Sequence, residues 1–282
     1  MATVCIIGAG ELGGAVAHAL ARGERIARVV LIDPAPAVAA GKALDMQQAG
    51  AIEGVHTALS GSDDETRVTG CSVCVIADRS GRPDVEWQAD EGLARIARLA
   101  GYLGGAPIVF AGAMQAPLLL AAAREAGIGR EQLIGSSPEA LASAVTAIVA
   151  MEARCAPGEV RLAVLGAPPD GFVVPWSEAS IGGYALDRVL SQVQLARLEA
   201  RLPRLWPPGP FALGLAAARV VEGLVTSSRR AFAVLSVLGG EFGVRGRAGA
   251  LPARLSPAGI AGVRVPALNT RERVQLETAL GL

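Results

Sequence analysis

Short apolar runs alternate with longer amphipathic segments along the first half of the chain. The runs are rich in Val, Ile and Leu and stop at Gly, Pro or Asp, which predicts buried strands of a parallel sheet. They cover residues 3–7, 28–32, 68–77, 107–110 and 132–134. Segments with apolar residues at helical spacing lie between them, at 10–22, 39–48, 87–103 and 117–126, with a further helix ending at 151. This alternation predicts an α/β fold with a doubly wound parallel sheet and helices on both faces.

The second half of the chain has a different order of elements. We expect a strand at 160–165, helices at 186–202 and 212–224, and antiparallel strands at 231–238 and around 263–266. This mixture predicts a separate α+β domain. The sequence therefore divides into domains 1–151 and 152–282, with the boundary near Met151 to Gly158.

Composition narrows the class of protein. Hydrophobic residues make up 51% of the chain and charged residues 18%, which is typical of a globular protein. Basic and acidic residues are equal at 26 each, so charge gives no reason to expect nucleic acid or a membrane as a partner. The apolar N-terminus lacks the basic segment of a signal peptide.

The four cysteines favour a reduced, cytoplasmic protein. Cys71 and Cys74 have the C-x-x-C spacing of a redox motif. We favour a buried strand over 72–76 instead, on which side chains three residues apart face opposite sides. We predict no metal site.

A glycine motif joins the first strand to the first helix. Gly8-Ala-Gly10-Glu11-Leu12-Gly13 has the G-x-G-x-x-G pattern in the right context for binding a dinucleotide. Gly8 would make the tight turn, Gly10 would let the pyrophosphate approach, and Gly13 would let helix and sheet pack closely. The helix N-terminus at Glu11 and Leu12 supplies free N–H groups. This pattern predicts a Rossmann domain; the alternative is a Rossmann turn that has lost its ligand.

Asp33 ends the second strand, 20 residues beyond Gly13. A carboxylate there can accept hydrogen bonds from the ribose hydroxyls and repels a 2′-phosphate. The predicted cofactor is therefore NAD in preference to NADP.

Several further short segments of the sequence are similar to those of a known family. Gly41-Lys-Ala-Leu-Asp-Met46 and Ile52-Glu-Gly54 follow the glycine motif, and similar matches occur at 133–135, 148–152, 173–175 and 180–183. The chain resembles the lactate/malate dehydrogenase family, bacterial malate dehydrogenases in particular, over most of its length. The resemblance implies a catalytic second domain and a homodimer or tetramer. It also implies that the helix containing the 41–46 block packs against a neighbouring subunit.

The residues that the family uses for catalysis are replaced in this chain. In the family a histidine exchanges the substrate proton, an aspartate orients it, arginines bind the substrate, and an asparagine positions it. The matching positions hold Pro168 (or Pro169, if the alignment shifts by one), Leu141, Ala144, Ala113 and Glu86. His18 and His56 lie elsewhere in the sequence. Arg79 and Arg82 are the candidate contacts for an anionic substrate.

Two functions follow from these replacements. The first is an NAD-binding protein of malate/lactate dehydrogenase type that cannot oxidise 2-hydroxy acids. The second is an active NAD-dependent oxidoreductase with a changed substrate or a substitute base. Its candidate groups are Asp78, Arg79, Arg82 and Glu86, with Asp170 and Tyr184. An ordinary malate or lactate dehydrogenase would need a catalytic base that we do not find.

Overall fold

The N-terminal half is built on a parallel sheet, as the alternating pattern predicts. The computed structural model describes residues 2–78, 86–87 and 89–282. Six parallel strands lie in the order β3-β2-β1-β4-β5-β6. They are β1 (Thr3–Ile7), β2 (Arg28–Ile32), β3 (Ala58–Ser62), β4 (Val73–Ile76), β5 (Ile108–Phe110) and β6 (Leu133–Gly135).

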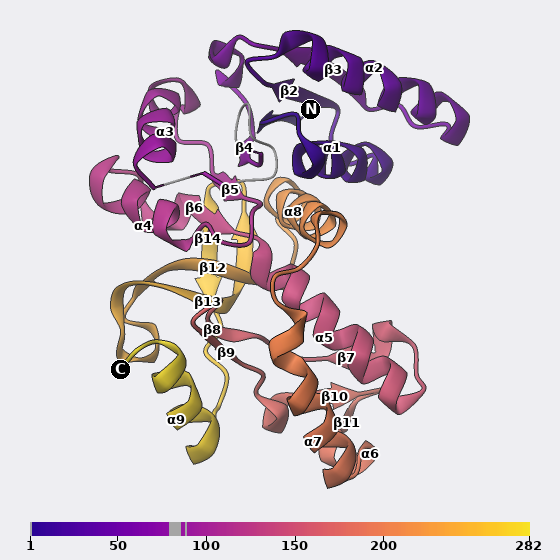
Figure 1. Ribbon diagram of the computed structural model, residues 1–282, viewed down its shortest axis with the longest axis vertical. Coiled ribbons are helices and arrows are strands. Elements are labelled where there is room, and N and C mark those ends of the chain that lie inside the picture. The colour runs from indigo at the N-terminus through magenta and orange to yellow at the C-terminus, as the bar shows by residue number, and fades with distance from the viewer. Residues whose placement is uncertain (1, 79–85, 88) are drawn as a thin grey trace.

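Helices cover both faces of this sheet (Figure 1). They are α1 (Glu11–Gly23), α2 (Pro36–Glu53), α3 (Ala89–Leu103), α4 (Ala116–Glu125) and α5 (Ser137–Ala153). Strand β1 shows why its residues are all apolar. Val4 and Ile6 belong to one core with residues of α1 and α2, whereas Cys5 and Ile7 belong to a second core with residues of α3 and α4. A strand buried on both faces has no polar side.

The C-terminal half extends the same sheet with antiparallel strands. Leu235 of β12 pairs with Gly135 of β6, and in the described part of the chain the sheet reaches 11 strands. The added strands are β8 (Leu165–Ala167), β9 (Gly171–Val173), β12 (Ala231–Gly239), β13 (Arg245–Ser256) and β14 (Gly259–Val263). The mixed character of this half is as expected, and the domain boundary near 151 stays a prediction.

A small second sheet and four more helices complete this half. The sheet consists of β7 (Val160–Arg161), β10 (Ser180–Ile181) and β11 (Tyr184–Ala185). The helices are α6 (Leu186–Val189), α7 (Gln192–Arg201), α8 (Pro210–Val225) and α9 (Thr270–Ala279). Short 3-10 helices lie in both halves of the chain, at Glu65–Val68, Arg130–Gln132, Pro157–Glu159, Trp176–Glu178, Leu202–Leu205 and Glu241–Gly243.

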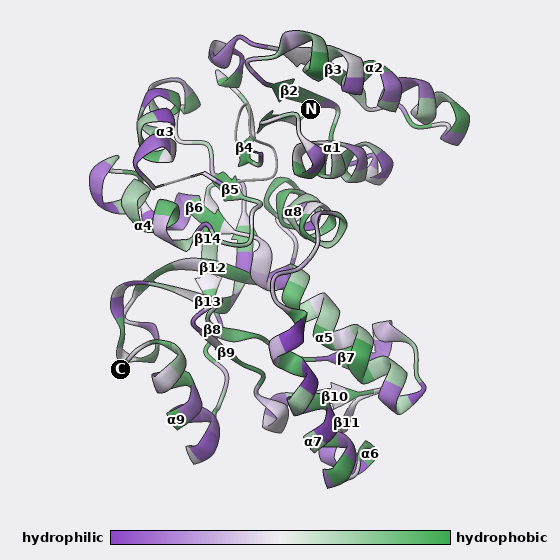
Figure 2. Cartoon of the chain, viewed as in Figure 1, coloured by the Kyte–Doolittle hydropathy of each residue, from purple (hydrophilic) through white to green (hydrophobic). Residues whose placement is uncertain are grey.

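Helix α8 returns to the N-terminal half and packs against α1. A Cβ atom on Gly214 would lie 2.6 Å from the Cβ of Ala15, so the two helices approach closely because residue 214 is glycine. Figure 2 shows α8 mostly in hydrophobic colours and α9 mostly in hydrophilic ones. Burial of α8 in the main core therefore joins the two halves.

Several predicted elements of the second half were wrong in detail. The strand expected at 160–165 is two strands in different sheets, β7 and β8. The helix expected at 186–202 is interrupted because Ser191 starts a new helix, with a capping box to Gln194. The strand expected at 263–266 is β14, which ends at Val263.

The described helices include no single one that is long and apolar enough to cross a membrane. One bent pair, at 192–205 and 210–225, meets the criteria of length and composition together, with an angle of 94° between its members.

Candidate functional site

The glycine motif makes the turn that the sequence predicts. Gly8 has a φ of +104°, and its N–H donates to the carbonyl of Ile32 at 2.8 Å, which ties the end of β1 to the end of β2. A Cβ atom on Gly13 would overlap the carbonyl oxygen of Gly8. Gly13 therefore permits the close packing of α1 on the sheet, and Gly8 and Gly13 have the structural roles assigned to them.

The N-terminus of α1 is occupied by a carboxylate of the chain itself. Asp78, just beyond β4, accepts hydrogen bonds from the backbone N–H of Leu12 at 3.0 Å and of Gly13 at 2.6 Å. A Cβ atom on Gly10 would lie 2.5 Å from the Asp78 Cγ. The missing side chain of Gly10 thus leaves room for a carboxylate, at the place where the motif admits a pyrophosphate.

Asp78 is buried, and the described cation that acts on it, Lys42, also binds a backbone carbonyl. The Nζ of Lys42, the only lysine, donates to the carbonyl of Gly10 at 2.5 Å. Burial raises the pKa of Asp78 above its ordinary value of 3.8, and the N–H donors of Gly13 and Leu12 together with the charge of Lys42 oppose that shift. The backbone N–H groups and Lys42 thus stabilise the ionised form only in part.

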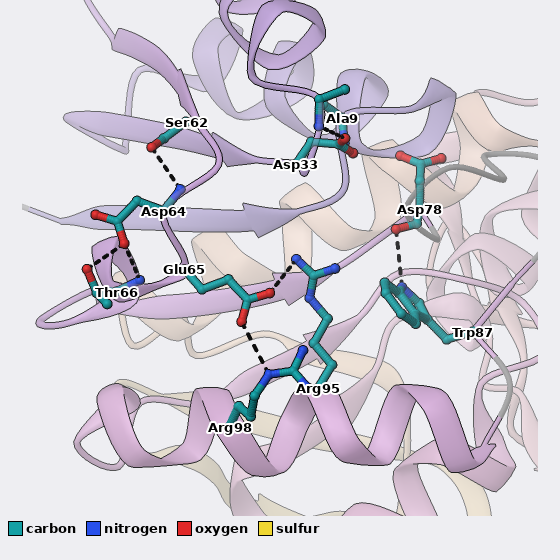
Figure 3. A network of polar contacts seen from close by, with 11 residues as sticks. Ala9, Asp33, Ser62, Asp64, Glu65, Thr66, Asp78, Trp87, Arg95 and Arg98 are labelled. Atoms are coloured by element: carbon teal, nitrogen blue, oxygen red, sulfur yellow. Dashed lines mark hydrogen bonds and ion pairs between the residues drawn. The ribbon is translucent and has the colours of Figure 1, made fainter.

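Asp33 lies at the end of β2, on the other side of β1 from Asp78 (Figure 3). One carboxylate oxygen accepts from the N–H of Ala9 at 3.0 Å and the other from the N–H of Ala35 at 2.9 Å. Asp33 therefore holds the glycine turn in place. Its contact with a ribose stays a prediction.

These contacts test whether the site fits NAD. The glycine turn and Asp33 suit the adenosine end of a dinucleotide. The N–H groups of Leu12 and Gly13, which would bind the pyrophosphate, already bind the carboxylate of Asp78. As it is folded, the site does not fit the pyrophosphate, so the roles of Gly10, Glu11 and Leu12 in cofactor binding stay predictions.

Glu86 is a second carboxylate that is bound by backbone N–H groups. Its two oxygens accept hydrogen bonds from the N–H of Ala113 at 2.7 Å and of Met114 at 2.8 Å, in the loop between β5 and α4. Burial raises the pKa of Glu86 above its ordinary value of 4.5, against the effect of these two donors. The sequence placed Glu86 and Ala113 in the site separately; the structure joins them by a hydrogen bond.

The other positions aligned with catalytic residues are apolar and packed. Leu141 has no exposed surface and lies in a core with Val145. Ala113 shares a small cluster with Ala140, Leu213 and Ala216, and Leu12 and Trp206 pack against it. Pro168 is buried in the turn between β8 and β9, and Ala144 is half-buried. The two histidines, His18 and His56, are exposed.

Not all of the other candidate groups belong to this site. Arg79 and Arg82 lie outside the described residues. Asp170 is an exposed residue of the turn between β8 and β9, and Tyr184 on β11 is 66% exposed in the small sheet. Figure 1 shows β11 well away from β4, so Tyr184 and Asp78 are not brought together. Among the described residues, no group of three or more His, Cys, Asp or Glu side chains could hold a metal ion.

The cysteines are free thiols. Cys71 precedes β4 instead of lying on it, and it belongs to the same core as Cys74. The expectation that these two side chains face opposite sides of a strand was therefore wrong.

Comparison with known proteins agrees with this fold. Residues 2–84 match the family described as lactate/malate dehydrogenase, NAD binding domain. Malate dehydrogenases from Salinibacter ruber and Thioalkalivibrio sulfidiphilus are 24% and 26% identical to the chain; each alignment covers 99% of the chain, and 93% and 96% of the relative, respectively. The chain is a distant relative of the malate dehydrogenases. This confirms the resemblance at the level of homology.

Solved structures show the same architecture. The malate dehydrogenase of Aeropyrum pernix superposes with a TM-score of 0.86 at 20% identity, covering 99% of this chain and 95% of that one. The lactate dehydrogenase of Cryptosporidium parvum, solved with lactic acid and NAD, also has a TM-score of 0.86 at 20% identity, with 99% and 94% covered. The predicted fold, a Rossmann sheet with a mixed C-terminal part, is confirmed.

The raised pKa of Glu86 has a measurable consequence for stability. A carboxyl whose pKa is raised by folding stabilises the native state while it is protonated, and that contribution is lost as the pH rises through the folded pKa. We therefore expect Glu86→Gln to gain stability relative to the wild type as the pH rises from about 4 towards neutrality. Thermal melting at several pH values measures this difference, with the exposed Glu277→Gln as control. Parallel profiles for the wild type and Glu86→Gln would contradict the assignment.

Proposed function

We propose that this chain is a non-catalytic relative of the NAD-dependent 2-hydroxy-acid dehydrogenases. The supporting observation is that buried Pro168 and Leu141 occupy the positions aligned with the proton-exchanging histidine and its aspartate. Proline has no side-chain proton to exchange, and leucine cannot orient an imidazole. Loss of general acid–base catalysis alone lowers a rate by about 10²–10⁴.

The charges around the site also disfavour a 2-oxo acid. Ala144 offers no cation to a substrate carboxylate, and the cluster that contains Ala113, Ala140 and Leu213 is apolar. A carboxylate that enters this cluster loses water without gaining an ionic partner from the residues that form it, which costs several kcal/mol. Glu86, which binds the loop at Ala113, adds repulsion where the family has an arginine.

One observation favours the alternative of an enzyme with a substitute base. Glu86 lies between β4 and α3 and binds the loop after β5, and a raised pKa in a partly buried carboxyl is a frequent property of catalytic acids and bases. In that case Glu86→Gln would abolish turnover of the unknown substrate. We prefer the non-catalytic function because both oxygens of Glu86 already accept backbone hydrogen bonds.

The proposal predicts no enzyme-like turnover with malate, lactate, oxaloacetate or pyruvate. Restoring a histidine alone, in Pro168→His, should not create activity, since its orienting aspartate and the carboxylate-binding arginine are still absent. A steady-state assay that follows NADH with each acid tests both proteins. Turnover of the wild type near the usual enzymatic range of about 1–10³ per second would refute the proposal.

The dinucleotide preference that we propose is for NAD over NADP. Asp33 is nearly buried at the end of β2, beside the glycine turn, and an additional 2′-phosphate would approach its carboxylate. Fluorescence titration should give weaker binding of NADPH than of NADH. Equal affinities would remove this role from Asp33.

We also propose that the chain forms a homodimer through α2, either alone or within a tetramer. Of the 18 residues in this helix only Ala39 and Ala43 are buried, while Leu44 is 56% and Ile52 is 90% exposed. An exposed apolar helix face is typical of a surface that another chain covers. The proposal includes no nucleic-acid or membrane partner, and it places the protein in the cytoplasm.

The dimer can be tested by sedimentation velocity. Ile52→Arg should shift the wild-type dimer towards monomer at micromolar concentration, because a desolvated arginine without a partner disfavours the interface. Val193→Arg, at a 62% exposed position on α7, is the matched control and should leave the assembly unchanged. A monomeric wild type would refute the proposal.

A further inference from the structure

The described structure places an anion of the chain on the N-terminus of α1. Asp78 is 5% exposed, and its two carboxylate oxygens accept from consecutive backbone N–H groups, those of Leu12 and Gly13. Such N–H groups, together with the positive end of the helix dipole, bind anions. At this helix the anion comes from residue 78 of the same chain.

The glycine motif shows what would otherwise occupy this position. Its second glycine has no side chain, so that a pyrophosphate can approach the backbone. In this chain a Cβ atom on Gly10 would lie 2.6 Å from the Oδ1 of Asp78 and 2.8 Å from its Cβ. The side chain of Asp78 therefore fills the space that Gly10 provides.

We propose that Asp78 is a built-in substitute for the cofactor's pyrophosphate, and that its carboxylate limits the affinity of this Rossmann site for dinucleotides. Asp78 and a bound pyrophosphate would compete for the N–H groups of Leu12 and Gly13. To bind, a dinucleotide must displace a carboxylate that is already hydrogen-bonded.

Two features keep Asp78 in this position. Its backbone carbonyl accepts a hydrogen bond from the indole N–H of Trp87 at 3.2 Å, and the Trp87 ring packs against the guanidinium of Arg95 at 5.2 Å (Figure 3). The hydrogen bond from Trp87 thus anchors the backbone carbonyl of Asp78.

The charges nearby do not favour a second anion. Lys42 on α2 is the cation whose charge acts on Asp78, and its Nζ is bound to the carbonyl of Gly10. Asp33, after β2, adds a further carboxylate on the other side of the glycine turn. Among the described residues, a diphosphate at this turn would meet the carboxylates of Asp78 and Asp33 and the ammonium group of Lys42.

The test compares the binding of ADP-ribose and adenosine by isothermal titration calorimetry. ADP-ribose carries the pyrophosphate of NAD, whereas adenosine has no phosphate. Asp78→Gly removes both the charge and the side chain, and Asp78→Asn removes the charge alone. We expect Asp78→Gly to bind ADP-ribose at least about tenfold more tightly than the wild type, equivalent to about 1.4 kcal/mol, and Asp78→Asn to bind it with intermediate affinity. Adenosine should bind equally to all three proteins.

The control Asp187→Asn makes the same charge change at an exposed position on α6 and should leave both affinities unchanged. Thermal melting establishes that each variant is folded. If Asp78→Gly does not fold, Asp78→Asn carries the test, and its affinity for ADP-ribose must exceed that of the wild type. Unchanged binding of ADP-ribose in folded variants would overturn the proposal, as would an equal gain for adenosine.

This inference rests on the proposed NAD-type site and not on the proposed loss of catalysis, so the two can fail separately. Turnover of a 2-oxo acid by the wild type would refute the non-catalytic function and leave the binding ratio to be measured. Tighter binding of ADP-ribose by Asp78→Gly, without any turnover, would support both.

Discussion

The hydrogen bonds from Leu12 and Gly13 to Asp78 connect the first helix of the chain to the end of β4. Strand β1 lies between β2 and β4, and the turn after it is held on both sides. Asp33 binds the turn at Ala9, and Asp78 binds the start of α1. The glycine turn, the position of α1 and the packing of α8 on α1 all depend on this arrangement. Ionised acceptors suit it because hydrogen bonds to charged groups are stronger than neutral ones.

The same interaction, a carboxylate bound to two consecutive backbone N–H groups, occurs twice. Asp78 binds two consecutive N–H groups at the start of α1, and Glu86 binds two consecutive N–H groups before α4. For both carboxyls burial is the largest cause of a raised pKa, and the backbone donors offset only part of its effect. Ligand anions would need these same donors. A chain that satisfies these donors internally leaves fewer of them free for a phosphate or carboxylate ligand.

Local signals predicted much of this structure. Strands β1 and β2 and the motif from Gly8 to Gly13 could be predicted because each depends on neighbouring residues. Strand β13 could not be predicted, since Arg245–Ser256 contains glycines, arginines and Pro252, and its pairing with β12 determines its conformation. The contact of Asp78 was equally out of reach. This contact joins Asp78 to Gly13 and Leu12, from which it is separated by 65 and 66 positions in the chain. The sequence showed only that Asp78 follows a strand.

A crystal structure of the wild type, grown with NAD⁺ at the concentration that half-saturates Asp78→Gly, would show which anion binds the N-terminus of α1. We predict that the carboxylate of Asp78 stays within hydrogen-bond distance of the N–H groups of Leu12 and Gly13, with no phosphate bound there. A pyrophosphate bound to these N–H groups, with the Asp78 side chain turned away, would contradict it.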